Sequence, residues 1–198
     1  NGQLIDKLTA KNIVASGLDR IIISIDGTTQ EVYEKYRRGG ELSKAIEAIK
    51  FINEAKKELN SKTPCIEAQF IVFKFNEHQI EDFKYLAPTW GANKISIKSA
   101  QIHNPNENSD IITSIDKYSR YKKVNNNWQI KKDFNKACLR AWTGIVISAD
   151  GNILPCCFDK QEKYIYENIN NKSVVDIWRN NKSQLFRQNL ITNRASYD

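Results

Sequence analysis

Residues 20–27 read Arg-Ile-Ile-Ile-Ser-Ile-Asp-Gly, a continuous apolar run that ends in polar residues and a glycine. Such a run, closed by a turn signal, is typical of a strand that is buried on both faces of a parallel sheet. In α/β folds the functional groups collect at the carboxyl ends of the strands. The stretch therefore predicts both a sheet and the place where Ser24 and Asp26 could do chemistry.

Strands and helices alternate on either side of this stretch. Residues 66–73 and 94–97 have the composition of further strands, and residues 42–59 carry apolar side chains at helical spacing on one face. Helices are also predicted over residues 4–15, 29–36 and 79–86. This alternation implies right-handed crossovers and a parallel sheet. The fold class is therefore α/β, and three strands are too few for a full eight-stranded barrel, so we expect a TIM-like (β/α) barrel half.

Polar residues on the three strands are the first candidates for a site. Ser24 and Asp26 share one strand parity, and a hydroxyl with a carboxylate would suit a ribose or an amino group. The alternative is that Asp26 forms an Asx-turn and Ser24 is a small filler. Residues of matching parity on the later strands could line the same lumen: Glu67, Gln69, Ser96 and Lys98.

Arg37 follows Asp26 after one short predicted helix. A guanidinium at that distance could return to bind a carboxylate bidentately. The alternative is that Arg37 and Arg38 are surface charges at a helix end.

Residues 138–157 read Cys-Leu-Arg-Ala-Trp-Thr-Gly-Ile-Val-Ile-Ser-Ala-Asp-Gly-Asn-Ile-Leu-Pro-Cys-Cys, which predicts a hairpin. A type I′ turn at Asp150 and Gly151 would join strands over residues 143–148 and 152–156. Folding back brings Cys156 toward the segment that starts at Cys138. Converging thiolates are the ligands of iron–sulfur clusters and of zinc.

The two adjacent cysteines should not act alike in an extended strand. Successive side chains of a strand point to opposite faces, so Cys156 and Cys157 are not expected to bind one cluster together. We favour Cys138 and Cys156 as a pair, with Cys157 as a buried thiol or an alternative ligand. Two or three thiolates do not complete a four-cysteine site.

The regular alternation stops after residue 100. Residues 101–110 are rich in Asn, Pro and Ser and predict a loop, and residues 111–123 are compatible with one helix. Near the end of the chain, residues 173–190 predict a single helix with Ser173 as its N-cap.

The chain has 198 residues and a formal net charge of +7. Basic residues gather between Lys117 and Lys136, where a solvated linker surface is a simpler interpretation than nucleic-acid binding. No apolar run reaches the roughly 18 residues of a membrane span, and no export leader is visible, so a cytoplasmic protein is expected. The chain begins at Asn1 and lacks methionine, so we expect a piece of a longer protein.

Two segments together resemble the radical S-adenosylmethionine (SAM) enzymes that carry a C-terminal SPASM or shortened twitch domain. The first contains Ser24, Asp26 and Gly27, then Arg37 and two glycines before the helix at residue 42. The second contains Cys138, Gly151 and Cys156, which match the cysteine, spacer, glycine, four residues and cysteine that open a SPASM domain. Residues around Trp178 and Phe186 also fit that domain.

The resemblance implies roles for these residues. Ser24 and Arg37 would hold the amino-acid part of SAM, with Asp26 beside them, and Cys138 and Cys156 would be ligands of an auxiliary [4Fe-4S] cluster. The implied reaction forms a 5′-deoxyadenosyl radical that takes a hydrogen atom from the substrate, which in many members is a peptide or protein. The implied electron donor is a flavodoxin or ferredoxin.

The resemblance also implies domain boundaries and shows which motifs of the family are missing from this chain. It implies a barrel part over residues 1–105, a connector over 106–137 and a truncated SPASM/twitch domain of α+β type over 138–198. The Cys-x-x-x-Cys-x-x-Cys loop that binds the radical-generating cluster is absent, as is a downstream Cys-x-x-Cys. Catalysis is therefore expected of the longer protein. The competing hypotheses are a zinc-binding or redox scaffold and a basic nucleic-acid-binding module.

Overall fold

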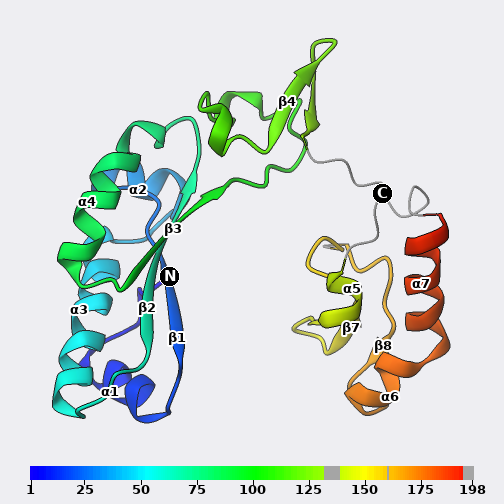
Figure 1. The fold of residues 1–198 in the computed structure, drawn as a ribbon, viewed down its shortest axis with the longest axis horizontal. Helices are drawn as coiled ribbons and strands as arrows, with labels where there is room; N and C mark the ends of the chain where they lie inside the picture. The colour runs from blue at the N-terminus through cyan, green and yellow to red at the C-terminus, as the bar shows by residue number, and fades with distance from the viewer. Residues whose placement is uncertain (132–138, 160, 194–198) are drawn as a thin grey trace. The chain divides into compact units, whose positions relative to one another are not determined.

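The computed structural model describes residues 1–131, 139–159 and 161–193. The chain divides into two compact units, Asn1–Lys131 and Lys132–Asp198 (Figure 1). Residues 106–131, which the sequence assigns to a connector, fall within the first unit. In the described ranges no helix is long and apolar enough to cross a membrane.

A parallel sheet organises the first unit. Its strands β1 (Arg20–Ser24), β2 (Cys65–Val72) and β3 (Lys94–Ser99) stand in the order β1–β2–β3. Both pairings are parallel, and the register places Ser24 opposite Gln69 and Gln69 opposite Ser96. The predicted α/β class with parallel strands is confirmed. The barrel half stays a prediction.

The helices of the first unit pack against this sheet. They are α1 (Lys7–Ala15), α2 (Gln30–Tyr36), α3 (Leu42–Glu58) and α4 (Ile80–Trp90), and α1, α3 and α4 lie on one side of it (Figure 1). Asp6 caps α1 by accepting the backbone N–H of Thr9 at 2.7 Å. Gly91 ends α4 in the left-handed conformation that glycine adopts without strain, with φ of 104°.

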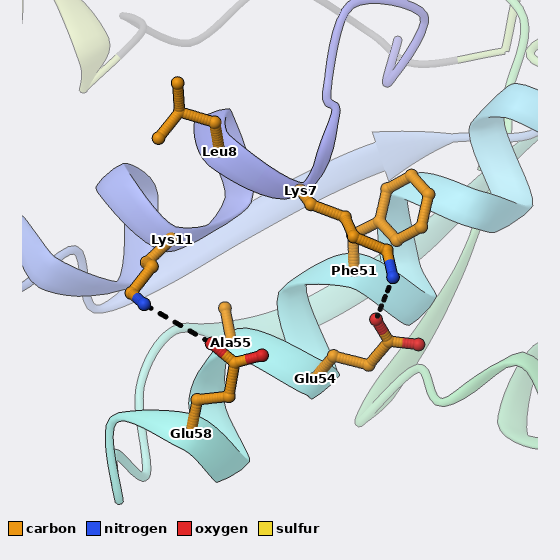
Figure 2. Close-up of a pocket in the computed structure, with 7 residues that line it drawn as sticks. All are labelled: Lys7, Leu8, Lys11, Phe51, Glu54, Ala55 and Glu58. Atoms are coloured by element: carbon orange, nitrogen blue, oxygen red, sulfur yellow. Dashed lines mark ion pairs between the residues drawn. The ribbon is translucent and has the colours of Figure 1, made fainter.

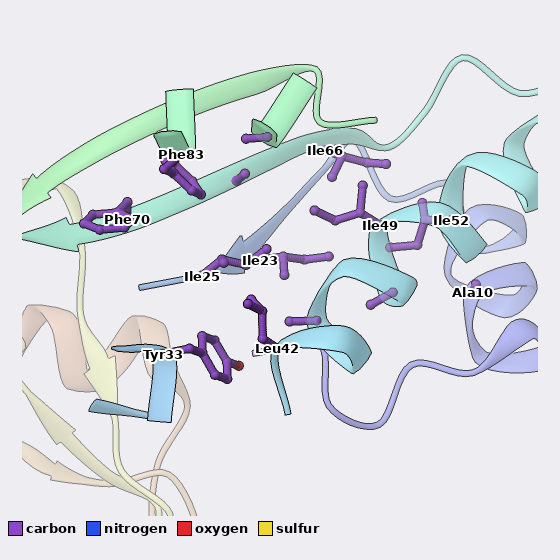
Figure 3. Packing of buried hydrophobic residues seen from close by; sticks show 14 of the residues in the cluster. Ala10, Ile23, Ile25, Tyr33, Leu42, Ile49, Ile52, Ile66, Phe70 and Phe83 are labelled. Atoms are coloured by element: carbon purple, nitrogen blue, oxygen red, sulfur yellow. The ribbon is translucent and has the colours of Figure 1, made fainter. Parts of the chain in front are cut away.

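The core lies between the sheet and these helices (Figure 3). Ile23 and Ile25 at the end of β1, Phe70 from β2, and Ile49 and Ile52 from α3 are all at most 1% exposed. Burying each of these side chains contributes about 2 kcal/mol. Because the residues of one parity fill the core, the other parity of the strands is left for polar side chains.

A hairpin follows the sheet where the sequence suggests a helix. Residues 111–123 do not form one helix: the short 3₁₀ turns η2 (Ser109–Ile111) and η3 (Asp116–Tyr118) precede β4 (Tyr121–Val124) and β5 (Asn127–Ile130). Asn125 and Asn126 have φ of 47° and 64°, the positive values that a type I′ turn requires. The Tyr121 hydroxyl bonds both backbone groups of Ile102, which fixes the hairpin to the loop after β3.

The second unit contains the predicted hairpin, with a different turn. After α5 (Arg140–Thr143), strands β6 (Val146–Ile147), β7 (Asn152–Leu154) and β8 (Glu167–Asn168) pair antiparallel. The backbone N–H of Gly151 donates to the Ser148 carbonyl at 3.0 Å, and Gly151 has φ of 84° while Asp150 does not have positive φ. The type I′ prediction is therefore wrong, and the geometry is that of a three-residue loop closed by a glycine bulge.

The C-terminal segment forms two helices instead of the single predicted one. These are α6 (Val174–Arg179) and α7 (Asn181–Thr192). Asn180 lies between them in an extended conformation, and its side chain caps α7 by accepting the Ser183 N–H at 2.8 Å. The prediction that Ser173 is an N-cap is confirmed, since its hydroxyl accepts the Asp176 N–H. Both helices pack on Ile153 and Tyr166.

Candidate functional site

The candidate site lies at the carboxyl end of β1, on the side of the sheet that the core leaves free. Ser24, Gln69 and Ser96 form a row across the three strands. The Gln69 side-chain amide donates to the Ser24 hydroxyl at 3.4 Å. Ser24 is half-buried, so its hydroxyl lies in a row of polar groups and not in the core.

Asp26 is fully buried beside this row. One carboxylate oxygen accepts the backbone N–H of Ile71 at 2.7 Å, and the other accepts Arg37 Nε at 2.6 Å. Burial raises the pKa of Asp26 above its ordinary value, and the hydrogen bond from Ile71 and the charge of Arg37 oppose that shift. The Asx-turn alternative is wrong, because the carboxylate bonds a distant strand and a distant side chain.

Arg37 comes to Asp26 from the end of α2. Its guanidinium carbon lies 5.0 Å from the centre of the Tyr36 ring, and its side chain is 24% exposed. Arg38 next to it is exposed. Within the described residues only Asp26 accepts a hydrogen bond from Arg37, through Nε. The surface-charge alternative is therefore wrong for Arg37, and its two terminal nitrogens remain for an external anion.

Two residues that the sequence reasoning missed fix the loop after β1. Asn76 is fully buried, and its amide donates to the carbonyls of Asp26 and Ile71, both at 2.9 Å. Gln79 accepts the backbone N–H of Thr28 at 2.7 Å. Both lie in a polar run after β2 that resembles a surface turn, so the sequence carries no signal for them beyond their place after a strand.

Glycines let α2 approach this loop closely. A Cβ on Gly27 would lie 2.5 Å from the backbone nitrogen of Tyr33, and one on Gly40 would lie 2.9 Å from the Arg37 carbonyl oxygen. Both contacts are with backbone atoms, which cannot move aside cheaply. The positions of Asp26 and Arg37 therefore depend on glycine at both places.

Glu67 is an acidic residue on the free face of the sheet. It is buried on β2 and forms an ion pair with Arg20 of β1. The Ser96 hydroxyl, and after it Arg20, lower the pKa of Glu67 despite its desolvation. Ser96 lies near Glu67, as their matching parity suggests, but its buried hydroxyl forms no hydrogen bond of normal geometry among the described residues. Lys98 is exposed further along β3. Whether they line a lumen stays a prediction.

The predicted metal ligands belong to the second unit. Cys138 lies outside the described residues. Cys156 is half-buried and Cys157 exposed, and Arg140 Nη1 donates to the Cys157 sulfur at 3.6 Å. The strand ends at Leu154, and residues 156–159 form a turn closed by a bond between the Asp159 N–H and the Cys156 carbonyl. The parity argument that separates the two thiols therefore does not apply, because it holds only for an extended strand, and the pairing of Cys138 with Cys156 stays a prediction. No group of three or more metal-binding side chains occurs in the described part of the chain.

A hollow of about 250 Å³ lies between α1 and α3 of the first unit (Figure 2). Lys7 pairs with Glu54 and Lys11 with Glu58 across it. Phe51 and Ala55 form part of its lining. It is a charged seam between two helices and contains none of the predicted site residues.

Comparison with known proteins identifies the second unit. Residues 138–197 match the family model SPASM, described as an iron-sulfur cluster-binding domain. This part of the chain is therefore similar to SPASM domains. The match begins at Cys138 and includes Cys156 and Cys157.

Two further proteins are similar to this chain. A GTP 3′,8-cyclase from Peptoclostridium acidaminophilum is 36% identical over 83 residues, which are 42% of this chain and 24% of that protein. The solved structure of hexahistidine-tagged anSMEcpe with bound AdoMet superposes with a TM-score of 0.55 at 14% identity, over 96% of this chain and 58% of that one. The predicted resemblance to radical SAM enzymes with a SPASM domain is confirmed. The chain spans about a quarter of the length of the curated relative.

Proposed function

We propose that the full-length protein is a radical SAM enzyme and that this chain supplies part of its SAM site and of its SPASM domain. The observation that carries the proposal is Arg37, whose Nε is bound to buried Asp26 at the carboxyl end of β1. Its remaining nitrogens are the donors that a carboxylate requires. The GTP 3′,8-cyclase match and the AdoMet-bound structural neighbour support SAM as the ligand.

The chain's own residues would bind the amino-acid part of SAM. Arg37 would take the carboxylate through its terminal nitrogens, and the Ser24 hydroxyl would accept from the ammonium group. Asp26 would not touch the ligand, because both of its oxygens already accept hydrogen bonds and the residue is fully buried. This refines the expectation that Asp26 is itself a binding residue.

The cysteines would hold an auxiliary [4Fe-4S] cluster with the remaining ligands outside this chain. Cys138 and Cys156 are the proposed ligands, and thiolates are the donor type that such clusters use. Cys157 is the proposed alternative ligand, because it lies in the same turn and Arg140 is beside its sulfur. A different [4Fe-4S] cluster, bound elsewhere in the full-length protein, would supply the electron for the cleavage of SAM to methionine and a hydrogen-abstracting 5′-deoxyadenosyl radical.

The substrate and the electron source belong to the proposal as well. A peptide or protein is the proposed substrate, since many SPASM proteins act on such molecules. A flavodoxin or ferredoxin is the proposed donor of the electron. The TIM-like barrel half, which the three parallel strands support, would enclose the reaction.

The test is SAM cleavage by the full-length protein. The protein is purified without oxygen, reconstituted with iron and sulfide, and incubated with SAM and dithionite, and 5′-deoxyadenosine is measured by chromatography. We expect 5′-deoxyadenosine from the wild type and at least about tenfold less from Arg37→Lys, because lysine cannot bind Asp26 and a carboxylate in the same plane. Arg38→Lys is the matched control, because Arg38 is exposed, and it should keep the wild-type rate.

Two results would contradict the proposal. A protein that retains zinc and no iron after reconstitution would favour the zinc scaffold. A reconstituted iron–sulfur protein that forms no 5′-deoxyadenosine would exclude SAM cleavage, whatever the metal content.

A further inference from the structure

We infer that Asp26 and Tyr36 are positioning residues, which hold the guanidinium of Arg37 in the orientation that receives the carboxylate of SAM. The inference rests on the proposed function and assigns to these two residues an effect on binding that neither exerts by contact with the ligand. It follows from two contacts of the guanidinium: Asp26 binds one of its edges, and the Tyr36 ring lies against one of its faces.

Asp26 fixes one edge of the guanidinium. Its carboxylate accepts Arg37 Nε at 2.6 Å, and its other oxygen is fixed to Ile71 of the neighbouring strand. Its own carbonyl is held by the Asn76 amide. The anchor is therefore tied to β2 and to the loop that follows it, through both its side chain and its backbone, so Arg37 Nε has a fixed partner.

Tyr36 supports one face of the guanidinium. The Arg37 guanidinium carbon lies 5.0 Å from the Tyr36 ring centre, within the range of a cation–π interaction. The Tyr36 ring is itself held against Phe73 at 4.6 Å, and Phe73 stacks on Phe75 at 5.1 Å. Tyr36 is 45% exposed, so burial of its ring does not account for its place beside Arg37.

The arrangement fits a zwitterion better than a simple anion. Asp26 already balances the charge of Arg37, so the pair offers directed donors without a net charge. The amino-acid part of SAM carries both a carboxylate and an ammonium group, and it therefore needs no net positive site. Because the guanidinium is oriented before the ligand arrives, little side-chain freedom is lost on binding.

The test compares two ligands that differ in the amino-acid part. S-adenosylhomocysteine carries the carboxylate and the ammonium group, and 5′-methylthioadenosine lacks both. Their affinities for the full-length, reconstituted protein are measured by calorimetry for the wild type and for Asp26→Asn, Tyr36→Ala and Tyr36→Phe. Tyr85→Ala is the matched control, because Tyr85 is 76% exposed on α4.

We expect the Kd of S-adenosylhomocysteine to rise about tenfold in Asp26→Asn and about threefold to fivefold in Tyr36→Ala, within the range for charged hydrogen bonds and cation–π contacts. The Kd of 5′-methylthioadenosine should stay within about twofold of wild type in both variants, because that ligand does not reach Arg37. Tyr36→Phe should restore wild-type affinity, since phenylalanine keeps the ring face.

Other outcomes overturn the inference. Equal weakening of both ligands would show a merely structural role, and unchanged binding of S-adenosylhomocysteine in Tyr36→Ala would show that Arg37 is oriented without the ring. If Asp26→Asn does not fold, the comparison of Tyr36→Ala with Tyr36→Phe tests the inference by itself. If the wild-type protein binds neither ligand, the proposed function itself is refuted. If it binds both ligands but the variants bind them as the wild type does, only the present inference is refuted.

Discussion

Glu77 should stabilise the first unit by a measurable and pH-dependent amount. Its carboxylate accepts three hydrogen bonds, two from Ser114 and one from the Thr113 hydroxyl, and Lys74 lies 3.1 Å away. These contacts tie the segment after β3 to η1 (Glu77–Gln79), which leads into α4. The Glu77 side chain is 14% exposed, so water offers little compensation when the contacts are lost.

The shift in the pKa of Glu77 sets an upper limit on its contribution to the free energy of unfolding. Burial alone would raise the pKa, but the hydrogen bonds from Ser114 and Thr113 and the contact with Lys74 outweigh it and lower the pKa from 4.5 to about 2. At about 1.4 kcal/mol per unit, this shift corresponds to about 3 kcal/mol at most. Glutamine keeps the volume and one acceptor, so Glu77→Gln should cost about 1–2 kcal/mol of local stability.

Hydrogen exchange followed by mass spectrometry measures this cost at the segment itself. In the full-length protein, Glu77→Gln should accelerate exchange of the Ser114 amide roughly 5- to 30-fold at neutral pH, the equivalent of about 1–2 kcal/mol. A lowered pKa means that the folded state favours the carboxylate. The stabilisation is therefore fully present above pH 4.5 and is lost as the pH falls toward 2, so the difference between variant and wild type should shrink over that range.

A second substitution serves as the control for Glu77→Gln, and two results would refute the reasoning. Glu81→Gln removes an exposed carboxylate of α4 that contacts Lys84, and it should leave Ser114 exchange unchanged. Wild-type exchange rates in Glu77→Gln at neutral pH would refute the reasoning. So would a difference between variant and wild type that persists undiminished at about pH 2.

Two other substitutions test contacts elsewhere in the first unit. Gly27→Ala should abolish SAM cleavage in the full-length protein or prevent its folding, because the new Cβ would lie 2.5 Å from the Tyr33 nitrogen; an active, stable variant measured by 5′-deoxyadenosine release would contradict this. Tyr121→Phe should leave both backbone groups of buried Ile102 without that hydroxyl, at a cost of about 1–2 kcal/mol. Faster exchange of the Ile102 amide is the expected readout, and unchanged exchange would show that another group replaces the hydroxyl.

The sequence predicted helices reliably where the spacing of apolar residues and the capping residues are enough to define a helix. The helices over residues 4–15, 29–36 and 42–59 are present within a few residues of their predicted limits, because spacing and caps are local properties. The helix predicted over residues 111–123 is wrong, because paired asparagines form a turn and the Tyr121 hydroxyl has a partner 19 residues away. The predicted single C-terminal helix is wrong because Asn180 caps a new helix.

In the candidate site, too, some features could be predicted from local sequence and others could not. Ser24 and Asp26 are recognisable because they lie at the end of an apolar strand, and Arg37 because it follows a short helix. The partners of the buried Asp26 carboxylate, Arg37 and the Ile71 backbone 45 residues away, depend on which segments meet in space. Asn76 and Gln79 escaped detection because amides after a strand look the same whether they face water or fix a buried loop.

The sequence by itself determined the parallel α/β class, the hairpin of the second unit and the identity of the polar residues at the end of β1. These depend on short-range rules: strand and helix periodicity, turn residues and motif spacing. Only the tertiary structure decided that the Arg37 guanidinium is fixed between a buried carboxylate and a tyrosine ring, because that contact joins β1, β2 and α2. Hydrogen-bond partners of buried polar groups are set by which segments meet in space, and sequence distance carries no record of that meeting.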